Sequence, residues 1–149
     1  MKKLFASLIL LALASCAAPP PPPAVLSLSI IGSAGQNPDP NGHGTAVAIR
    51  LYQLTATGKF QSTDVYSLMN QEASVLGTDE AGASEQILLA PGQKLSETLS
   101  LKPSVTSLGV AVLFQDINHS TWKLVAPLAA SGTTALTLQI NGLTATLHK

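Results

Sequence analysis

The residue types that could support catalysis meet at one place in the chain, at Asp116, His119 and Ser120. They are the types found in a serine-hydrolase triad, in which a base takes the proton of the nucleophile and an acid orients the base. No nucleophile-elbow pattern surrounds Ser120, and closeness in sequence does not by itself provide the required geometry. We therefore expect the chain to contain no catalytic residue.

Metal ligands are equally sparse. Asp39, Asn41 and His43 alternate like the first ligands of a calcium loop, but Arg50 stands where such a loop needs a bidentate glutamate. The histidines are too scattered for a zinc site and have no pair of acidic ligands beside them. We expect no metal and no cofactor, and we expect surface or loop positions for all three histidines: His43, His119 and His148.

Composition excludes several further classes of function. The chain has 149 residues, enough for one domain, with 46% hydrophobic and 11% charged residues. Its 8 Lys+Arg balance its 8 Asp+Glu, whereas a nucleic-acid-binding protein needs a basic surface to neutralise phosphates. Aromatic residues make up only 4%, and the single cysteine rules out an intrachain disulfide. We expect neither nucleic acid nor a small-molecule substrate as a partner.

The single cysteine, Cys16, follows an N-terminal segment typical of a lipoprotein signal peptide. Lys2 and Lys3 precede an apolar run over residues 4–14, which is well short of the ~20 residues that span a bilayer. The run ends in Leu-Ala-Ser-Cys, a bacterial lipobox. We predict that residues 1–15 are removed and that Cys16 carries a covalent lipid. The alternative is an ordinary secretory peptide with an incidental cysteine.

The residues after Cys16 predict where that lipid would hold the protein. Several acyl chains anchor a protein stably without a transmembrane helix. Ala17 follows the cysteine, whereas an aspartate there is the common signal for retention at the inner membrane, so we expect the outer membrane and the periplasm. Pro19–Pro23 predict a polyproline II spacer of roughly 15 Å, which makes residues 16–24 a stiff tether. A proline-rich recognition motif is the alternative.

From residue 25 onward the apolar residues alternate with polar ones, which is typical of strands with one buried face. Leu108–Gln115 is apolar on both faces and reads as a central strand, and Asn141-Gly142 predicts a type I′ hairpin turn. We expect an all-β domain over residues 25–149, a two-sheet β-sandwich of about eight strands. The strands are expected over residues 25–31, 45–54, 85–90, 94–101, 108–115, 121–128, 134–140 and 143–148.

Two segments interrupt the strand pattern. Ser62–Gly77 has apolar residues at helical spacing, with capping residues at its start and Gly77 at its end. We expect one short inserted helix that closes an open end of the sandwich. Gly32–Gly44 is a loop of thirteen residues with four glycines and two prolines. Loops of this length are uncommon in compact domains and are usually functional or mobile. We expect its polar groups to be unburied and the loop to protrude; the alternative is a connector without a role.

Several motifs together resemble one family, the TssJ (SciN-like) outer-membrane lipoproteins of type VI secretion. The stretch NPDPNGHGTAVAIRLYQL, residues 37–54, contains the family's Asn-x-Asp-x-x-Gly and Arg-x-Tyr-Gln-Leu. Phe60 with Asp64, Leu89-Ala90-Pro91-Gly92, and GVAVLFQDINHSTWK over residues 109–123 follow in the family's order. Gln115 and Lys123 depart from it, because the family usually has a basic residue at the first position and Arg at the second.

The resemblance implies a transthyretin-like β-sandwich with an added helical element and a scaffold role. It implies anchoring in the outer membrane and binding of the periplasmic C-terminal domain of the inner-membrane protein TssM, with TssL as an indirect partner. The loop between the first two strands is implicated in that docking, which here comprises Ser33, Ala34, Gly35, Gln36, Asn37, Pro38, Asp39, Pro40, Asn41, Gly42, His43 and Gly44. Because one fold hosts many functions, a periplasmic ligand-binding or hydrolytic lipoprotein is the alternative.

Overall fold

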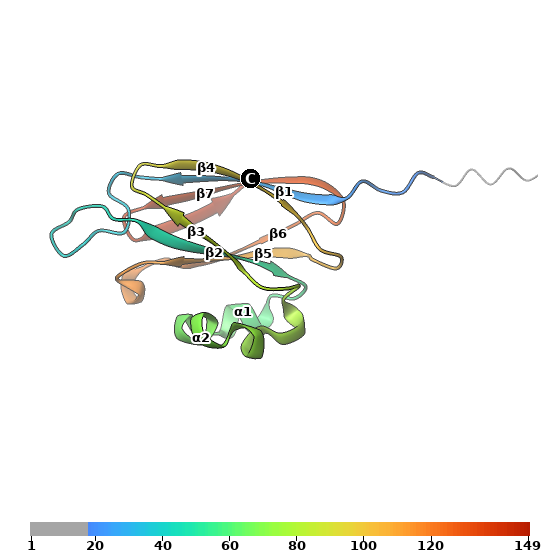
Figure 1. The fold of residues 1–149 in the computed structure, drawn as a ribbon, viewed down its shortest axis with the longest axis horizontal. Helices are drawn as coiled ribbons and strands as arrows, with labels where there is room; N and C mark the ends of the chain where they lie inside the picture. Colours follow the sequence, from blue (N-terminus) through green and yellow to red (C-terminus); the bar gives the residue numbers. More distant parts are fainter. Residues whose placement is uncertain (1–17) are drawn as a thin grey trace, which may run out of the picture.

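The computed structural model describes residues 18–149. The predicted signal peptide and Cys16 lie outside the described residues, so both remain predictions. Residues 18–23 are exposed and extend away from the domain (Figure 1). Within residues 18–149, every helix is too short or too polar to cross a bilayer.

Eight strands form two four-stranded sheets that pack face to face (Figure 1), which confirms the predicted all-β sandwich. All strand pairs are antiparallel except the pair formed by β1 and β7. The first sheet has the order β4 (Lys94–Ser100), β1 (Ala24–Gly32), β7 (Gly132–Asn141), β8 (Thr144–His148). The second has the order β3 (Glu85–Leu89), β2 (Val47–Leu54), β5 (Ser107–Leu113), β6 (Lys123–Pro127).

The core between the sheets follows from the alternation in the sequence. Leu26, Leu28 and Ile30 of β1 point inward, and the alternating residues of β2 meet them from the other sheet. Strand β5 lies between β2 and β6 and is buried on both faces over residues 107–112, as predicted for Leu108–Gln115. One face of β5 belongs to this core, so its other face needs a second cover.

Two helices provide that cover. Helix α2 (Val65–Leu76) begins at Asp64, whose carboxylate accepts from the backbone N of Tyr66 and Ser67, and it ends at Gly77, which has a φ of 54°. The helix predicted over Ser62–Gly77 is therefore confirmed, and a shorter helix α1 (Gly58–Ser62) precedes it. A 3-10 turn, η1 (Gly77–Asp79), follows.

The position of these helices differs from the expected one. They lie on the outer face of the second sheet and do not close an open end of the sandwich (Figure 1). The physical reason is that the outer face of this sheet is apolar where the helices sit, and burying it is favourable. A second hydrophobic cluster forms there from Tyr52, Leu54, Phe60, Leu68, Leu76 and Ala111. At Gly109 an added Cβ would lie only 2.9 Å from Leu54 Cδ1 and 3.0 Å from Phe60 Cζ, so glycine permits the close approach of α1.

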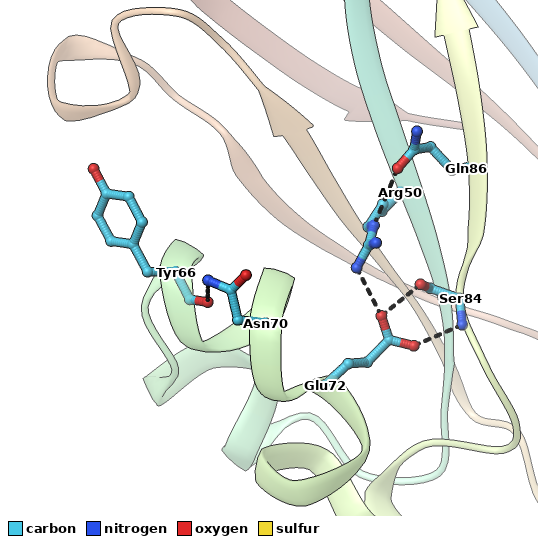
Figure 2. A network of polar contacts seen from close by, with 6 residues as sticks. All are labelled: Arg50, Tyr66, Asn70, Glu72, Ser84 and Gln86. Carbon is cyan, nitrogen blue, oxygen red and sulfur yellow. Dashed lines mark hydrogen bonds and ion pairs between the residues drawn. The ribbon is translucent and has the colours of Figure 1, made fainter.

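Polar contacts fix both helices to the sheet. Figure 2 shows Glu72 of α2 paired with Arg50 of β2. Arg50 Nη1 lies 3.0 Å from Glu72 Oε2, and both side chains are largely buried. Glu72 also accepts from the backbone N and Oγ of Ser84, at 2.9 and 2.6 Å. Lys123 Nζ of β6 donates to the carbonyls of Phe60, Gln61 and Thr63 at 3.2, 2.8 and 2.6 Å. Burial lowers the pKa of Lys123 from its ordinary value.

The turn of the last hairpin lies one position later in the chain than predicted. Asn141 pairs with Thr144 as the last residue pair of β7 and β8, so the two-residue turn is Gly142-Leu143, whereas Asn141-Gly142 was expected. Of the two turn residues only Gly142 has a positive φ, 57°. A type I′ turn requires positive φ at both central residues, while a glycine at the first central position is the requirement of type II′.

Candidate functional site

The β1–β2 loop lies at the end of the sandwich opposite the tether (Figure 1). Strand β1 starts at the tether and ends at the loop after nine residues, a length of about 30 Å at the rise of a β-strand. We call this the distal end; it also contains the β3–β4 turn, the β5–β6 segment (residues 114–122) and the β7–β8 turn. The sequence predicted the loop but not its neighbours.

The base of the loop is buried, which corrects the expectation that its polar groups would stay unburied. Gln36 is 0% exposed and Asn37 is 2% exposed. Hydrogen bonds made inside the protein offset the burial of a polar side chain: Gln36 Nε2 donates to the carbonyl of Leu89 at 2.8 Å, whereas Gln36 Oε1 has no partner within the described residues. The Gln36 amide packs directly on Gly32, where any Cβ would clash with it. Gln36 thus joins the loop to the β3–β4 turn.

Asn37 makes the densest set of contacts in the loop. Its Nδ2 donates to the Ala46 carbonyl at 2.8 Å and to Thr45 Oγ1 at 2.9 Å. Its Oδ1 accepts from the backbone N of Gln115 at 2.8 Å. Its backbone N donates to the carbonyl of Gly142 at 2.8 Å. Asn37 therefore bonds to the opposite side of its own loop, to the β5–β6 segment and to the β7–β8 turn.

The tip of the loop, Pro38–His43, protrudes as expected (Figure 1). It is closed by its own hydrogen bonds: Asp39 Oδ1 accepts from the backbone N of Asn41 and of His43, both at 2.9 Å. The backbone N of Asp39 donates to the His43 carbonyl at 2.9 Å. Gly42 has a φ of 83°, which the tight turn requires. The bond from the backbone of His43 is the main cause that lowers the pKa of Asp39.

The twelve residues predicted for docking thus divide by exposure. Two are buried, Gln36 and Asn37. Four are partly buried, Ser33, Pro38, Asp39 and Gly44. Six are exposed, Ala34, Gly35, Pro40, Asn41, Gly42 and His43. The exposed residues are the ones available for a partner, and most of them belong to the tip.

A cleft of about 430 Å³ lies between the tip and the two neighbouring segments. Its lining comes from three parts of the chain: Pro38, Asp39 and Pro40 of the tip, Gln115 and Asp116 of the β5–β6 segment, and Leu143 of the β7–β8 turn. Sequence reasoning missed the contribution of the last two parts. Asn37 Oδ1 and Gln115 N, which join two of these walls, are 78 positions apart in sequence, and no local pattern indicates such a contact.

The residues considered for catalysis do not form a triad. His119 Nδ1 lies 2.7 Å from Asp116 Oδ1, but the Ser120 hydroxyl donates to the carbonyl of Ile117 at 2.9 Å. Within residues 18–149, His, Cys, Asp and Glu side chains nowhere gather in groups of three that could hold a metal ion. The Asp39 carboxylate, considered for calcium, accepts hydrogen bonds from its own loop.

Residues 24–143 match the sequence model of the type VI secretion lipoproteins, T6SS-SciN, described by the names VasD, EvfM and TssJ. The chain belongs to this family. The resemblance recognised from the motifs is confirmed, and so is the assignment to type VI secretion. The family model describes lipoproteins of type VI secretion.

Solved structures have the same fold. TssJ1 from Pseudomonas aeruginosa superposes with a TM-score of 0.82 at 23% identity, over 85% of this chain and 96% of that one. The Serratia marcescens protein Lip, a membrane-bound component of the type VI secretion system, gives 0.74 at 24% identity, over 85% and 97%. These two likenesses establish the shared fold. No curated protein sequence matches the chain significantly.

Two further matches are somewhat closer in sequence. A chain in the structure of the type VI membrane complex has 26% identity and a TM-score of 0.74, over 85% of this chain and 98% of that one. A chain in the structure described as the C-terminal domain of the type VI secretion protein TssM from EAEC has 26% identity and a TM-score of 0.69, over the same shares.

Proposed function

We propose that this lipoprotein is anchored in the outer membrane by a lipid on Cys16 and docks the periplasmic C-terminal domain of a TssM-like inner-membrane protein. The proposed contact is the β1–β2 loop, through its tip. The observation that carries the proposal is the position of that tip, which protrudes from the distal end while the tether leaves the opposite end (Figure 1). A lipid at Cys16 would then leave the tip facing away from the outer membrane.

Membership of the type VI secretion lipoproteins supports the anchoring part of this proposal. The matches in the structures of the membrane complex and of the TssM C-terminal domain support TssM as the partner. TssL would be reached only through TssM. The role is one of assembly without catalysis, in agreement with a Ser120 hydroxyl that donates to a backbone carbonyl.

The tip suits protein docking because its shape exists before any partner arrives. Its hydrogen bonds through Asp39 hold the turn closed, so little conformational freedom is lost on binding. Its exposed residues are small or polar, which favours an interface of modest size with a polar rim.

The docking contact can be tested with exposed tip residues alone. Deleting the whole loop would also remove the buried Gln36 and Asn37, so we choose the triple variant Pro40→Ala, Asn41→Ala, His43→Ala and leave Asp39 and Gly42 in place. Its matched control is Ser96→Ala with Thr98→Ala, on the exposed face of β4. Affinity for the TssM C-terminal domain, measured by calorimetry with the full chain in detergent, should fall for the tip variant only. Equal affinity of the tip variant and the control would refute docking through the tip.

The lipid anchor is tested separately. Cys16→Ser removes the thiol that would carry the acyl chains, and membrane fractionation should then find the protein outside the outer membrane. Binding to the TssM domain in solution should be unchanged, because Cys16 lies at the tether and not at the distal end. A Cys16→Ser protein that still fractionates with the outer membrane would contradict the proposed anchor.

A further inference from the structure

We propose that Asn37 is the positioning residue of the docking surface: it holds the tip of the β1–β2 loop at a fixed place relative to the β5–β6 segment and the β7–β8 turn. This inference rests on the proposed function and specifies which residues act in it. Asn37 itself is 2% exposed, so it would not touch the partner. It would act through the position of the residues that do.

Asn37 is connected to each of the three parts of the chain that line the cleft at the distal end, which we call its three walls. The first wall, Pro38–Pro40, follows Asn37 directly in the chain. The second wall is tied to it because Gln115 N donates to Asn37 Oδ1. The third wall is tied to it because Asn37 N donates to the carbonyl of Gly142, next to Leu143. A single buried residue therefore bonds to the segments on all three sides of the cleft, in addition to the direct bond of 2.9 Å between Thr121 N and the Leu143 carbonyl that joins the second and third walls.

Asparagine is the residue type that these contacts require. Its side-chain amide supplies donors and an acceptor together, and here Nδ2 donates twice while Oδ1 accepts once. Its φ is 46°, in the left-handed region that asparagine tolerates better than most residues. Aspartate would keep the acceptor but lose both donors, and glycine would keep the backbone but lose the amide. The hydrogen bonds of the side chain and the positive φ of the backbone therefore both favour asparagine at position 37.

Thr45 completes the arrangement on the other side of the loop. Its Oγ1 donates to the Asn37 carbonyl at 2.6 Å and accepts from Asn37 Nδ2. It also accepts from Gln115 Nε2 at 2.8 Å. The two sides of the loop and the β5–β6 segment are consequently joined through one cluster of three side chains, Asn37, Thr45 and Gln115.

Loss of the Asn37 amide should free the tip without unfolding it. The Asp39 turn closes the tip independently, so the tip would move as a small rigid unit on a loosened base. Apparent affinity falls in proportion to the fraction of molecules in the competent arrangement. If that fraction falls to about one tenth, Kd rises about tenfold.

The experiment compares Asn37→Gly with Asn141→Gly, an exposed asparagine in β7 beside the last turn. Asn37→Gly tolerates the positive φ, removes the side chain with its amide, and keeps the backbone bond from residue 37 to the Gly142 carbonyl. Kd for the TssM C-terminal domain is measured by calorimetry with the full chain in detergent. We expect a rise of about tenfold for Asn37→Gly and less than twofold for Asn141→Gly. Thermal melts report whether each variant is folded at the temperature of the titration.

A second comparison separates positioning from direct contact with the partner. The tip variant Pro40→Ala, Asn41→Ala, His43→Ala is measured in the wild-type and Asn37→Gly backgrounds. A positioning role that acts through the competent fraction predicts that the tip substitutions raise Kd by the same factor in both backgrounds, because the competent arrangement makes the same contacts in each. A clearly smaller factor in the Asn37→Gly background would mean that Asn37 and the tip act in one contact with the partner, and would overturn the inference.

The outcomes also separate this inference from the proposed function. Wild-type protein that fails to bind the TssM domain would overturn both. Wild-type binding with an unchanged Kd for Asn37→Gly would overturn the positioning role alone, and docking through the tip would stand.

Discussion

Replacing Lys123 by methionine should loosen the helical layer from the sandwich. Lys123 extends from β6 to the end of α1, where its ammonium donates to three carbonyls and lies 4.8 Å from the centre of the Trp122 ring. Methionine keeps most of the aliphatic stem and removes the donors. The carbonyls of Phe60, Gln61 and Thr63 would then lose their partner at a helix end, where backbone acceptors have none within the helix.

The magnitude follows from the two short bonds, at 2.8 and 2.6 Å. A hydrogen bond to a charged group contributes about 1.5 kcal/mol at the lower end of its range. Two such bonds give about 3 kcal/mol, and partial hydration of the freed carbonyls reduces this to about 2.5 kcal/mol. For a domain of this size, that loss corresponds to a fall in Tm of about 10 °C.

The assay is chemical denaturation combined with hydrogen exchange. The free energy of unfolding is compared for wild type, Lys123→Met and the exposed control Lys94→Met, which should stay within about 0.5 kcal/mol of wild type. Exchange of the Gln61 and Thr63 amides, which donate within α1, should accelerate for Lys123→Met only. If Lys123→Met were as stable as Lys94→Met, the attribution of α1 docking to the ammonium would be wrong.

Three further changes test the fold. Gly109→Ala places a Cβ against Leu54 and Phe60 and should lower the free energy of unfolding by about 1–3 kcal/mol, while Gly58→Ala, whose Cβ meets no atom within 4 Å, should not; denaturant titration compares them. Asp64→Ala removes the α2 cap and should lower Tm at pH 7; the Tm difference from wild type should shrink as pH falls through the lowered pKa of Asp64, and a difference that stayed constant through acid pH would count against the charged cap. Glu80 has a pKa raised to about 7, first by burial and then by the charge of Glu72; its contribution to stability is complete below about pH 4.5 and declines as pH rises through about 7. The Tm of Glu80→Gln should therefore rise relative to the Tm of wild type between pH 5 and pH 8. A Tm difference that stayed constant over this range would contradict the raised pKa of Glu80.

The sequence predicted the sandwich because its strands are locally consistent. The alternation in β1 and the apolar run of β5 indicate one strand buried on one side and one buried on both. The helix over residues 65–76 was equally predictable, since Asp64 and Gly77 mark its ends. Each of these signals lies within a few residues of the element that it defines.

The errors arose where the answer depends on contacts distant in sequence. Burial of Gln36 depends on the carbonyl of Leu89, 53 positions away, and burial of Asn37 depends on Gln115. A loop rich in glycine and polar residues gives no local sign that two of its side chains find such partners. The position of the two helices was mispredicted for a related reason. Tyr52 and Leu54 are apolar residues on the outer face of β2, but the sequence of β2 does not indicate which segment packs against them.

Polar contacts have different roles at two places in the sandwich, the outer face of the second sheet and the distal end. On the outer face of the second sheet, Lys123 and the Arg50–Glu72 pair hold the helices against an apolar surface, so their loss should lower stability. At the distal end, Asn37 and Thr45 hold the base of the loop that carries the tip, so their loss should change the position of the tip as well as remove hydrogen bonds. Docking should therefore respond to Asn37→Gly and not to Lys123→Met, and a comparable rise in Kd for Lys123→Met would contradict this separation.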